Sequence, residues 1–517
     1  MQKATQQVPD QTSSRQLLVD LRGVARGQWG AELERSVRSA IRAGRLRPGA
    51  RLPSTRALAG DLGVSRSVVV QAFDQLAAEG YLTTRPGAVA RVSDIGAVRP
   101  APGGRPARVV HPAEAPSVTR PDVDLRPGSP NLGSLPRAEW GRAVRKALAT
   151  LTDAELGYGD SRGLPGLREA IADYLGRVRG AVVDPDDLVV VNGFAQGLVV
   201  VARMLDELGI AAVGVEDPGS VHTSTHLADQ AITVVPVPVD DQGVDIDAAR
   251  RRASRPLRAV MVTPAHQFPT GAVLSPARRL GLVEWAERAD GVVIEDDYDS
   301  EYRYDHHAVG TLQGMAPDRV VLGGSVSKTL APGLRLGWLA VPAALSADAG
   351  RHKRSIDLMT PVLEQAALEQ LIRSGGYERH IRRCRVGYRR RRDVVVELLA
   401  DELPEAEVLG TSAGLHLLVT IPSAADETVI EQEAARRGVQ VCGLGRYRRS
   451  SDSPGRYGSS RPSGFVLGYG HLTEDQLRRG LRGFAAAVRA TPGSRTLAYG
   501  GRIDLRVGRS SDRHQGG

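Results

Sequence analysis

The amino-acid sequence predicts a multidomain protein that joins a small winged helix-turn-helix module to a larger α/β domain. The chain has 517 residues, which is too long for one ordinary domain. From about residue 122 onward, short apolar runs alternate with helical stretches, and this order predicts a mostly parallel sheet. Residues 96–121, rich in proline, glycine and arginine, are expected to form a linker between the two parts.

Composition divides the rest of the chain further. Residues 1–27 are polar and are expected to be a flexible N-terminus, and residues 28–95 form the helical module. Residues 122–488 form the α/β domain with a smaller α+β lobe at its C-terminal end. The insert 446–463 and the basic tail 489–517 are rich in glycine, serine and arginine, which predicts disorder.

Apolar runs of strand length give the expected strands of the large domain. They are residues 188–191, 211–216, 233–239, 258–263, 291–296 and 319–324, with 414–421 and 464–469 in the C-terminal lobe.

The net charge of +9 is unevenly distributed. Residues 1–95 carry +6, residues 96–121 carry +3 and residues 489–517 carry +4, whereas residues 122–488 carry −4. A basic N-terminal module beside an acidic body predicts a polyanionic partner for that module.

Cysteine content and hydropathy indicate the compartment. Cys384 and Cys442 have no metal-type spacing, so we expect no metal site, no disulfide framework and a reducing cytoplasm. The first thirty residues lack the apolar core of a signal peptide. No apolar run reaches the roughly 18 residues that a membrane span needs, so no membrane partner is expected.

Residues 52–80 predict two helices joined by a tight turn. Ser54 or Thr55 caps the first helix, Gly63 makes the turn and Ser65 caps the second helix. The apolar positions of the second helix are Val69, Ala72, Phe73, Leu76 and Ala77.

In a helix-turn-helix, the second helix enters the major groove with its N-terminal residues nearest the bases. Arg66 at this position suits a guanine edge, and Arg56 at the start of the first helix suits a phosphate. Residues 81–92 are expected to form a two-stranded wing with Arg85 at its tip. The expected DNA-contacting residues are Ser54, Thr55, Arg56, Ser65, Arg66, Ser67 and Arg85.

The stretch IRAGRLRPGARLPSTRALAGDLGVSRSVVVQAFDQLAAEGYL, residues 41–82, resembles the winged helix-turn-helix of the GntR family over its full length. Leu52-Pro53-Ser54, Arg56 and the run Leu62 to Arg66 fall where that family has them. The wing departs from the frequent Gly-x-Gly, because Gly87 is followed by Ala88-Val89. The resemblance therefore implies DNA binding mainly through the recognition helix.

Lys328 stands out in the large domain because the chain has 68 basic residues, of which four are lysines. A guanidinium stays protonated, whereas a lysine amine can lose its proton and attack a carbonyl. Lys328 is therefore a candidate for Schiff-base formation, with an ordinary surface lysine as the alternative.

Other chemistry-bearing groups also follow strands, where open α/β sheets bind their ligands. VNGFAQG (191–197) predicts an anion site at a helix N-terminus. VIEDDYDSEYRY (293–304) offers acids and tyrosines, and VTPAHQFPTG (262–271) is a third loop. An anion pocket, a reactive lysine, an acid for a pyridinium and aromatic hydroxyls are together what pyridoxal 5′-phosphate (PLP) needs.

Residues 122–488 resemble the fold-type I, class I aminotransferases, and SVSKTLAPGLRLGW resembles their Schiff-base segment. The resemblance implies that Lys328 forms the internal aldimine and that Asp296 pairs with the pyridine nitrogen, with Asp297 as the alternative acid. Tyr298 would meet the ring hydroxyl, and Tyr158 would reach the phosphate of a neighbouring subunit. The phosphate would be held by Ser325, Arg335, Gly193, Phe194 and Ala195.

Three positions depart from the enzyme pattern. Phe268 stands where the enzymes carry an asparagine, so His266 or Gln267 is expected to contact the ring hydroxyl instead. Ser220 replaces the aromatic residue that stacks on the ring, which leaves His222 or an ordinary loop there. The arginine that clamps the substrate carboxylate falls near Val466, and the nearby alternative is Arg461 in the insert. Without that clamp, efficient transamination is not expected.

The combination of the two domains resembles the MocR/GabR-type subfamily of GntR regulators, many of which are head-to-tail dimers. It implies a double-stranded DNA operator, a homodimer and an effector that is PLP, as in regulators of vitamin B6 synthesis, or an amino acid. The rival interpretations are an active aminotransferase with an accessory DNA-binding module and an aminotransferase-like scaffold that binds no PLP. The basic run 379–393 is expected to be a solvated or dimer-facing helix, with a contribution to DNA binding as the alternative.

Overall fold

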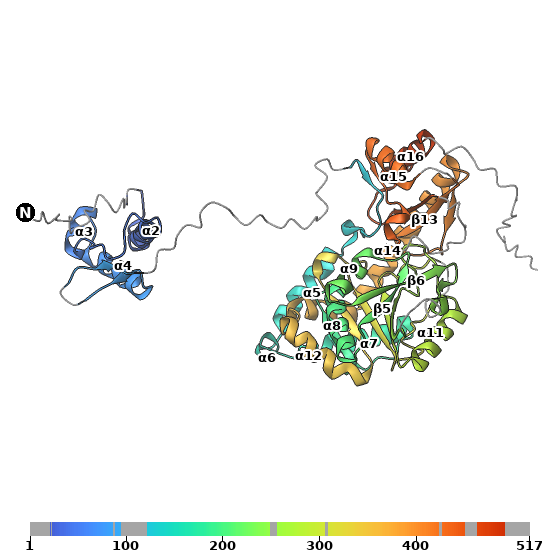
Figure 1. The fold of residues 1–517 in the computed structure, drawn as a ribbon, viewed down its shortest axis with the longest axis horizontal. Helices are drawn as coiled ribbons and strands as arrows, with labels where there is room; N and C mark the ends of the chain where they lie inside the picture. Colours follow the sequence, from blue (N-terminus) through green and yellow to red (C-terminus); the bar gives the residue numbers. More distant parts are fainter. Residues whose placement is uncertain are drawn as a thin grey trace, which may run out of the picture. The chain divides into compact units, whose positions relative to one another are not determined.

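The computed structural model describes residues 21, 23–85, 88–94, 121–248, 256–304, 309–422, 426–449 and 463–491. The chain separates into two compact units, Met1–Ser117 and Val118–Gly517 (Figure 1). Each unit has its own hydrophobic core, so each is described by itself.

The N-terminal unit is a helix-turn-helix with a wing. Its elements are η1 (Arg26–Gln28), α2 (Trp29–Arg42), α3 (Thr55–Leu62), α4 (Arg66–Ala78), β1 (Leu82–Thr83) and β2 (Arg91–Val92). The Ser54 side chain caps α3 by accepting a hydrogen bond from the Ala57 N–H, and Gly63 ends α3 in a left-handed conformation at φ 66°. The expected apolar face of α4 is buried at Val69, Ala72, Phe73 and Leu76, while Ala77 is half-buried.

The large unit is built on a mixed, mostly parallel sheet. Its described strands are β4 (Leu188–Val191), β5 (Ala212–Asp217), β6 (Thr233–Asp240), β7 (Gly243–Val244), β8 (Ala259–Val262), β9 (Val292–Asp297), β10 (Val320–Ser325) and β11 (Gly337–Ala340). Their order across the sheet is β4-β11-β10-β9-β8-β5-β6-β7. The neighbours from β10 to β6 pair in parallel, whereas β11 and β7 pair antiparallel with their neighbours.

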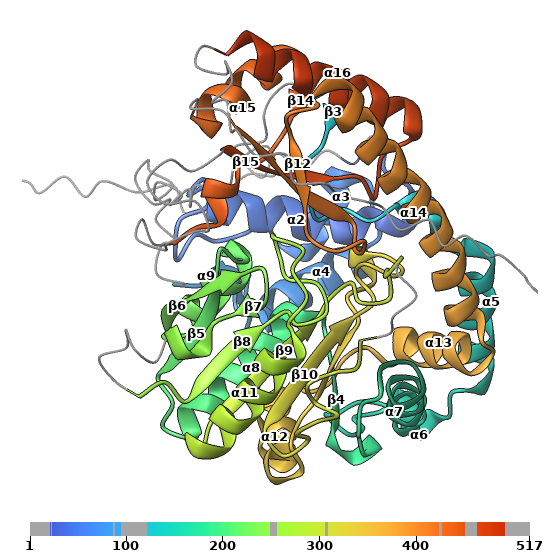
Figure 2. The ribbon, with the colours of Figure 1, turned by 90° about the vertical axis from the view of Figure 1, so that its right-hand side faces the viewer.

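Helices cover both faces of this sheet (Figure 2). They include α5 (Arg137–Thr150), α6 (Asp153–Leu156), α7 (Pro165–Arg179), α8 (Phe194–Glu207), α9 (Val221–Asp229), α11 (Pro276–Arg288), α12 (Ser346–Asp357) and α13 (Val362–Arg373). Alternate residues of β4 enter different cores, because Leu188 and Val190 pack with α7 and α13 while Val189 and Val191 pack with α8. The carboxyl ends of the parallel strands remain free to carry a site.

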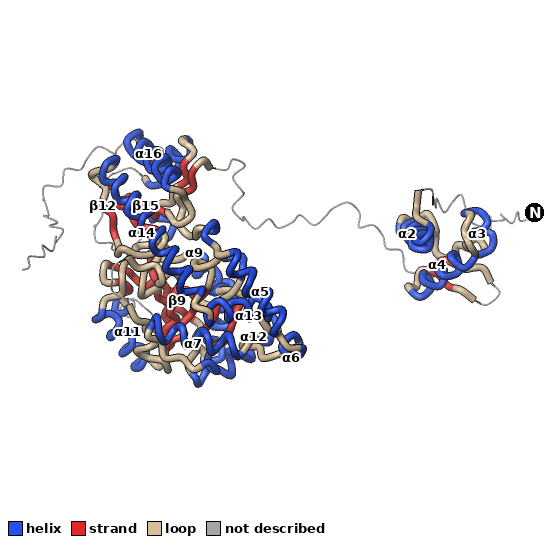
Figure 3. The backbone as a smooth tube through the Cα atoms, turned by 180° about the vertical axis from the view of Figure 1, so that it is seen from behind, coloured by secondary structure: helices blue, strands red, loops and turns tan. Residues whose placement is uncertain are grey.

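A smaller α+β lobe follows the large sheet. It contains the antiparallel strands β12 (Glu407–Leu409), β13 (His416–Ile421) and β15 (Ser463–Gly468), together with α15 (Glu427–Arg436) and α16 (Glu474–Ala490). The long helix α14 (Gly376–Glu402) connects this lobe to the helices α13 and α5 (Figure 3). The chain enters through β3 (Val123–Asp124), which pairs with β14 (Val439–Gln440) of the same lobe.

The structure confirms the expected fold class and all eight expected strands, each within one or two residues. It adds β11, a short strand that begins at the end of the lysine segment and that the apolar pattern does not predict. The prediction of disorder was wrong for the start of the insert, because Leu444–Tyr447 form a 3-10 helix that packs on β15. The rest of the insert, residues 450–462, the linker residues 95–120 and the tail residues 492–517 lie outside the described part of the chain.

In the part of the chain that the structure describes, no helix is long and apolar enough to cross a membrane.

Candidate functional site

A cavity of about 440 Å³ lies between the carboxyl ends of the parallel strands and the small lobe. Strands β5, β8 and β9 deliver residues to it, as do the segment after β10 and strand β13. Its titratable lining residues are Glu216, His222, Asp296, Tyr298, Asp299, Lys328, His416 and Tyr447. Phe268, Val215, Met261, Val262 and Leu415 supply most of its apolar wall.

Lys328 reaches this cavity from the turn that joins β10 to β11. Its Nζ donates a hydrogen bond to the Gly128 carbonyl oxygen, which fixes the amine at the cavity wall. Burial lowers the pKa of the Lys328 amine, while the carboxylates of Asp299 and Asp296 act in the opposite direction. A lysine held half-buried with a lowered pKa supplies more of the neutral amine that nucleophilic attack requires.

The two neighbouring acids of β9 have different surroundings. Asp296 lines the cavity and has no hydrogen-bond partner among the described residues. Burial, and then the nearby carboxylates of Asp297 and Asp299, raise the pKa of Asp296 well above its usual value. Asp297 instead forms a buried bidentate ion pair with Arg179, with both N–O distances at 3.0 Å. The geometry therefore leaves Asp296 available to a ligand and commits Asp297 to the fold.

Tyr298 and Asp299 line the cavity and form a polar cluster with His266, which is buried and is not among the lining residues. His266 Nδ1 lies 3.0 Å from an Asp299 carboxylate oxygen and 3.1 Å from the Tyr298 hydroxyl. The Tyr298 hydroxyl also donates a 3.0 Å hydrogen bond to the His266 carbonyl oxygen. Of the two candidates beside Phe268, the structure thus brings His266, and not Gln267, to the tyrosine.

Gln267 holds its own loop together. Its Nε2 donates to the Pro218 and Phe268 carbonyl oxygens and to a Glu216 carboxylate oxygen. Its Oε1 accepts from the backbone and hydroxyl of Thr270. All polar atoms of this side chain are engaged, so it fixes the turn that presents Phe268 to the cavity.

His416 is a site residue that sequence reasoning missed. It is 3% exposed, lines the cavity and stacks on His266 with ring centroids 4.8 Å apart. Its Nε2 has no hydrogen-bond partner among the described residues, and burial lowers the pKa of the imidazole well below its usual value. The sequence carries a signal for this residue, because His416 is the one ionisable residue in the apolar strand GLHLLVTI.

An anion-binding corner lies at the N-terminus of α8. Gly193 is the N-cap residue at φ 77°, and Phe194 and Ala195 follow as the first residues of the helix, so their N–H groups are not used within it. The Arg335 guanidinium packs against Gly193 and donates to the Asn192 carbonyl oxygen. Ser325 ends β10 and accepts a hydrogen bond from the Ser327 N–H. The structure therefore brings the glycine turn and Arg335 into contact.

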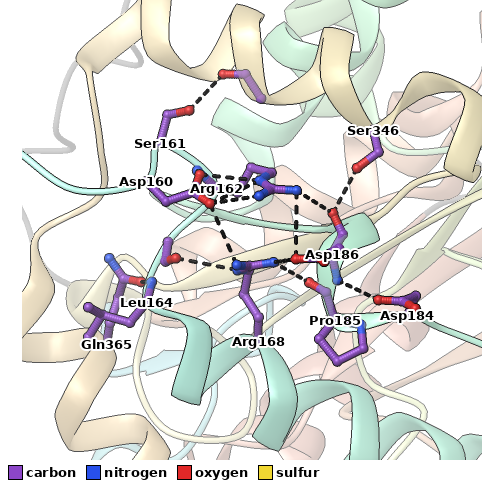
Figure 4. Close-up of polar contacts among 12 residues, drawn as sticks. Asp160, Ser161, Arg162, Leu164, Arg168, Asp184, Pro185, Asp186, Ser346 and Gln365 are labelled. Atoms are coloured by element: carbon purple, nitrogen blue, oxygen red, sulfur yellow. Dashed lines mark hydrogen bonds and ion pairs between the residues drawn. The ribbon is translucent and has the colours of Figure 1, made fainter.

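Tyr158 lies away from these groups and is 89% exposed. The segment that follows it is held firmly by ion pairs and hydrogen bonds (Figure 4). Asp160 pairs with Arg162 at 2.8 Å, and Arg168 donates to Asp186 at 2.9 Å and to the Pro185 carbonyl oxygen at 2.6 Å. A large aromatic side chain displayed to solvent from an anchored segment suits a contact with another molecule.

The structure shows the surroundings of most of the positions that depart from the aminotransferase pattern. Val466 is fully buried in β15 against Leu418 and Leu444, and no arginine lines the cavity among the described residues. Arg461 lies outside the described residues. Ser220 caps α9 by accepting from the Thr223 N–H, and His222 is exposed on α9 at the cavity lining.

In the N-terminal unit the expected DNA-contacting residues are mostly exposed. Ser65, Arg66 and Ser67 begin α4, and the Ser65 hydroxyl bonds to the Ser67 hydroxyl rather than capping the helix. Arg66 lies 3.4 Å from the Thr55 hydroxyl, which joins the starts of α3 and α4 in one surface. Arg56 and Arg85 are exposed, with Arg85 next to the end of β1.

Comparison with known proteins agrees with both units. Residues 30–92 match the bacterial regulatory proteins of the gntR family, and residues 128–448 match the aminotransferase class I and II family. The pyridoxine biosynthesis transcriptional regulator PdxR of Corynebacterium glutamicum is 33% identical over 460 residues, covering 88% of this chain and 95% of that protein. The probable rhizopine catabolism regulatory protein MocR of Rhizobium meliloti is 33% identical over 484 residues, covering 90% and 95%.

The chain belongs to the MocR-type GntR family of transcription regulators. This regulator carries a winged helix-turn-helix that binds DNA and a domain of the PLP-dependent aminotransferase type. The fold of that domain matches kynurenine aminotransferase of Pyrococcus horikoshii with a TM-score of 0.64 and 24% identity, covering 72% of this chain and 91% of that one. An aspartate aminotransferase variant of Thermus thermophilus gives a TM-score of 0.60, also at 24% identity, covering 71% and 91%.

The cofactor of the regulator is PLP, and the cavity residues fit it. The fit rests on an amine at Lys328, an unpaired carboxylate at Asp296 and, at the N-terminus of α8, a glycine turn against which the Arg335 guanidinium packs. When bound, PLP supplies an aldehyde for the amine and an electron-accepting ring.

Proposed function

We propose that the regulator senses PLP itself and that cofactor capture by Lys328 controls how tightly the paired DNA-binding modules hold their operator. The proposal rests on the lining of the cavity, which contains both the Lys328 amine and the unpaired Asp296 carboxylate. No arginine is among the described lining residues, so nothing there would clamp a substrate carboxylate. A ligand can shift an equilibrium only through its different affinities for the two states. The cavity offers PLP such contacts, and it offers an amino-acid carboxylate few.

Each cavity group has a proposed task toward the cofactor. Asp296 pairs with the protonated pyridine nitrogen, which explains why this acid is left without a protein partner. Tyr298 and His266 meet the ring hydroxyl. Phe194 and Ala195 hold the phosphate with their N–H groups, Gly193 forms the turn before them, and Ser325 and Arg335 assist.

The charge of the cavity favours a ligand with no free carboxylate. Glu216 and Asp299 lie on its lining beside Asp296, while Lys328 is the one lysine there. Burial raises the pKa of Glu216 to about 7, so this acid is partly ionised near neutral pH and repels an approaching anion. An amino acid would bring its carboxylate into this acidic wall with no described arginine to meet it.

A homodimer completes the proposed site. Tyr158 is displayed to solvent, and exposed apolar side chains of the same unit include Leu148, Leu156 and Leu358. Surfaces of this kind mark interaction sites. We place Tyr158 at the phosphate of the partner's cavity, in a head-to-tail arrangement of the two chains. Because PdxR of C. glutamicum is named for pyridoxine biosynthesis, genes of that pathway are the first candidates for regulation.

An absorption spectrum tests the proposal. PLP added to the purified regulator should give a visible band that is absent from Lys328→Ala, and a panel of amino acids should leave that band unchanged. Binding of promoter DNA should change when PLP is added to the wild type and should not change in Lys328→Ala. Conversion of the band to the pyridoxamine form over many cycles would instead make the chain an aminotransferase, and absence of any band would reduce the domain to a scaffold.

A further inference from the structure

The helix α14 carries an arginine-rich face that the cofactor site does not use. The exposed residues Arg379, Arg382, Arg383, Val386, Arg389 and Arg390 recur at intervals of three or four. That spacing places them on one side of the helix, and Val386, in their middle, is 72% exposed. In Figures 2 and 3, α14 runs along the outer edge of the large unit, beside α5 and α13.

The arginines of this face are poorly neutralised by the protein. Arg383 and Arg389 have no hydrogen-bond or ion-pair partner among the described residues, and Arg379 donates only to the Ser374 carbonyl oxygen. Arg382 lies 3.8 Å from Glu378, whose carboxylate also pairs with Arg177 at 3.0 Å. Arg390 is the exception, because it pairs with Glu474 at 2.6 Å.

Apart from Glu378, the acids of α14 are segregated from these arginines. Continuing along the same side of the helix, Asp393, Glu397 and Asp401 are exposed and follow the last arginine of the face. A helix that needed only solubility would be expected to interleave both signs at i, i+4 spacing. The segregation is also unusual for a domain whose residues 122–488 carry a net charge of −4. The basic half of α14 is therefore a local positive field on an acidic body.

We propose that the arginine face of α14, residues 379–390, binds the phosphate backbone of the DNA held by the helix-turn-helix modules. The face is about 16 Å long at 1.5 Å per residue. Duplex DNA presents a phosphate about every 3.4 Å along each strand, so about five phosphates of one strand lie along that length. Arginine binds phosphate bidentately, and contacts of this kind position a protein without reading the sequence.

The covalent connection permits this contact. Residues 95–120 are 26 in number and join the two units. A chain of that length spans at most about 90 Å, which exceeds the length of the arginine face several times. Once a helix-turn-helix module is bound, the large unit is held near the same duplex and weak phosphate contacts gain from the high effective concentration.

The test measures binding of the full-length protein to a labelled mixed-sequence duplex of about 40 base pairs, at salt concentrations from about 50 to 200 mM. The variant Arg383→Gln/Arg389→Gln removes two unpaired charges per chain. We expect roughly tenfold weaker binding at low salt and a salt dependence less steep by about two in the log–log slope for each contacting face. Charge reversal, Arg383→Glu/Arg389→Glu, should weaken binding further.

A matched control removes the same charge elsewhere. Arg288→Gln/Arg436→Gln alters exposed arginines of α11 and α15 that form only local surface ion pairs. Its affinity and salt slope should stay close to the wild type. Equal effects of the two double variants would overturn the proposal, because net charge alone would then explain the loss.

Two further outcomes separate this inference from others. A change in oligomeric state by light scattering, with unchanged affinity per oligomer, would make the arginine face a protein–protein interface and would also overturn it. If the wild type fails to bind the duplex while its cofactor spectrum is normal, the DNA-binding function itself fails, irrespective of α14. Circular dichroism of each variant establishes that the fold is retained.

Discussion

At the scale of single residues, two adjacent acids show how position decides function. Asp296 and Asp297 are both carboxylates at the end of β9, yet the pleat directs them to opposite sides of the sheet. Asp297 meets Arg179, which is 4% exposed and also donates to the Val309 carbonyl oxygen. Asp296 meets the cavity and is crowded by other carboxylates. One acid is paired within the fold, and the other faces the cavity.

Substituting each acid by its amide should separate these roles. Asp297→Asn leaves the Arg179 charge buried without its partner and should lower the free energy of unfolding by about 3 kcal/mol. Asp296→Asn removes a repelled carboxylate, so stability without cofactor should be unchanged or higher, while PLP affinity should fall about tenfold to a hundredfold. Chemical unfolding and a spectroscopic PLP titration measure both effects. An equal loss of stability in both variants would contradict the assignment.

At the scale of elements, the turn into α8 combines backbone and side-chain requirements. Gly193 lies at φ 77°, and a Cβ there would come within 2.9 Å of Arg335 Nη1. Arg335 itself adopts a left-handed backbone at φ 53°, which places its guanidinium against the turn. The corner at the start of α8 therefore needs a glycine at position 193, because a side chain there would collide with the Arg335 guanidinium.

Gly193→Ala should displace the Arg335 guanidinium and weaken phosphate binding. We expect PLP affinity to fall about tenfold, with a smaller loss for pyridoxal, which lacks the phosphate. Gly209→Ala is the matched control, because Gly209 also has a positive φ of 67° near the other end of α8 but faces open space. Both variants carry a backbone cost of about 1 kcal/mol. Equal losses for PLP and pyridoxal in Gly193→Ala would show that the turn does not serve the phosphate.

At the scale of the whole molecule, the exposed Tyr158 requires a partner if it serves the cofactor. The residues that follow it are anchored by the network of Asp160, Arg162 and Arg168 (Figure 4), and the tyrosine itself is 89% exposed. A site shared between two chains would couple cofactor binding to dimer geometry. Dimer geometry would in turn set the spacing of the two DNA-binding modules.

Mixed dimers test this sharing directly. Lys328→Ala and Tyr158→Ala should each bind PLP poorly as homodimers. Co-expressed with different affinity tags and purified as heterodimers, they should regain one complete site per dimer, because the intact Lys328 of one chain would meet the intact Tyr158 of the other. Spectroscopic titration gives the number of sites. No recovery in the heterodimer would place Tyr158 outside the partner's site.

The sequence alone determined most of the elements. The alternation of apolar runs and helices predicted eight of the strands, and the GntR-like stretch predicted both helices of the helix-turn-helix, because these depend on local periodicity, caps and turns. Lys328 stands out in the sequence because lysine is scarce in this chain. These features can be predicted because each depends on residues that are close together in the sequence.

The tertiary structure decided which of several equivalent residues reach the cavity. Sequence spacing left Asp296 and Asp297 as alternatives, and only the Arg179 pair, 118 residues away, distinguishes their surroundings. His416 and Tyr447 come from the small lobe and meet Phe268 in the loop after β8. These segments are about 150 and 180 residues apart in the chain, so no local pattern predicts the contact. The arginine face of α14 also depends on the tertiary structure. Only the structure shows which arginines are exposed on one side of the helix and how few of them have an acidic partner. Packing across long sequence separations, and not local propensity, fixes a binding site.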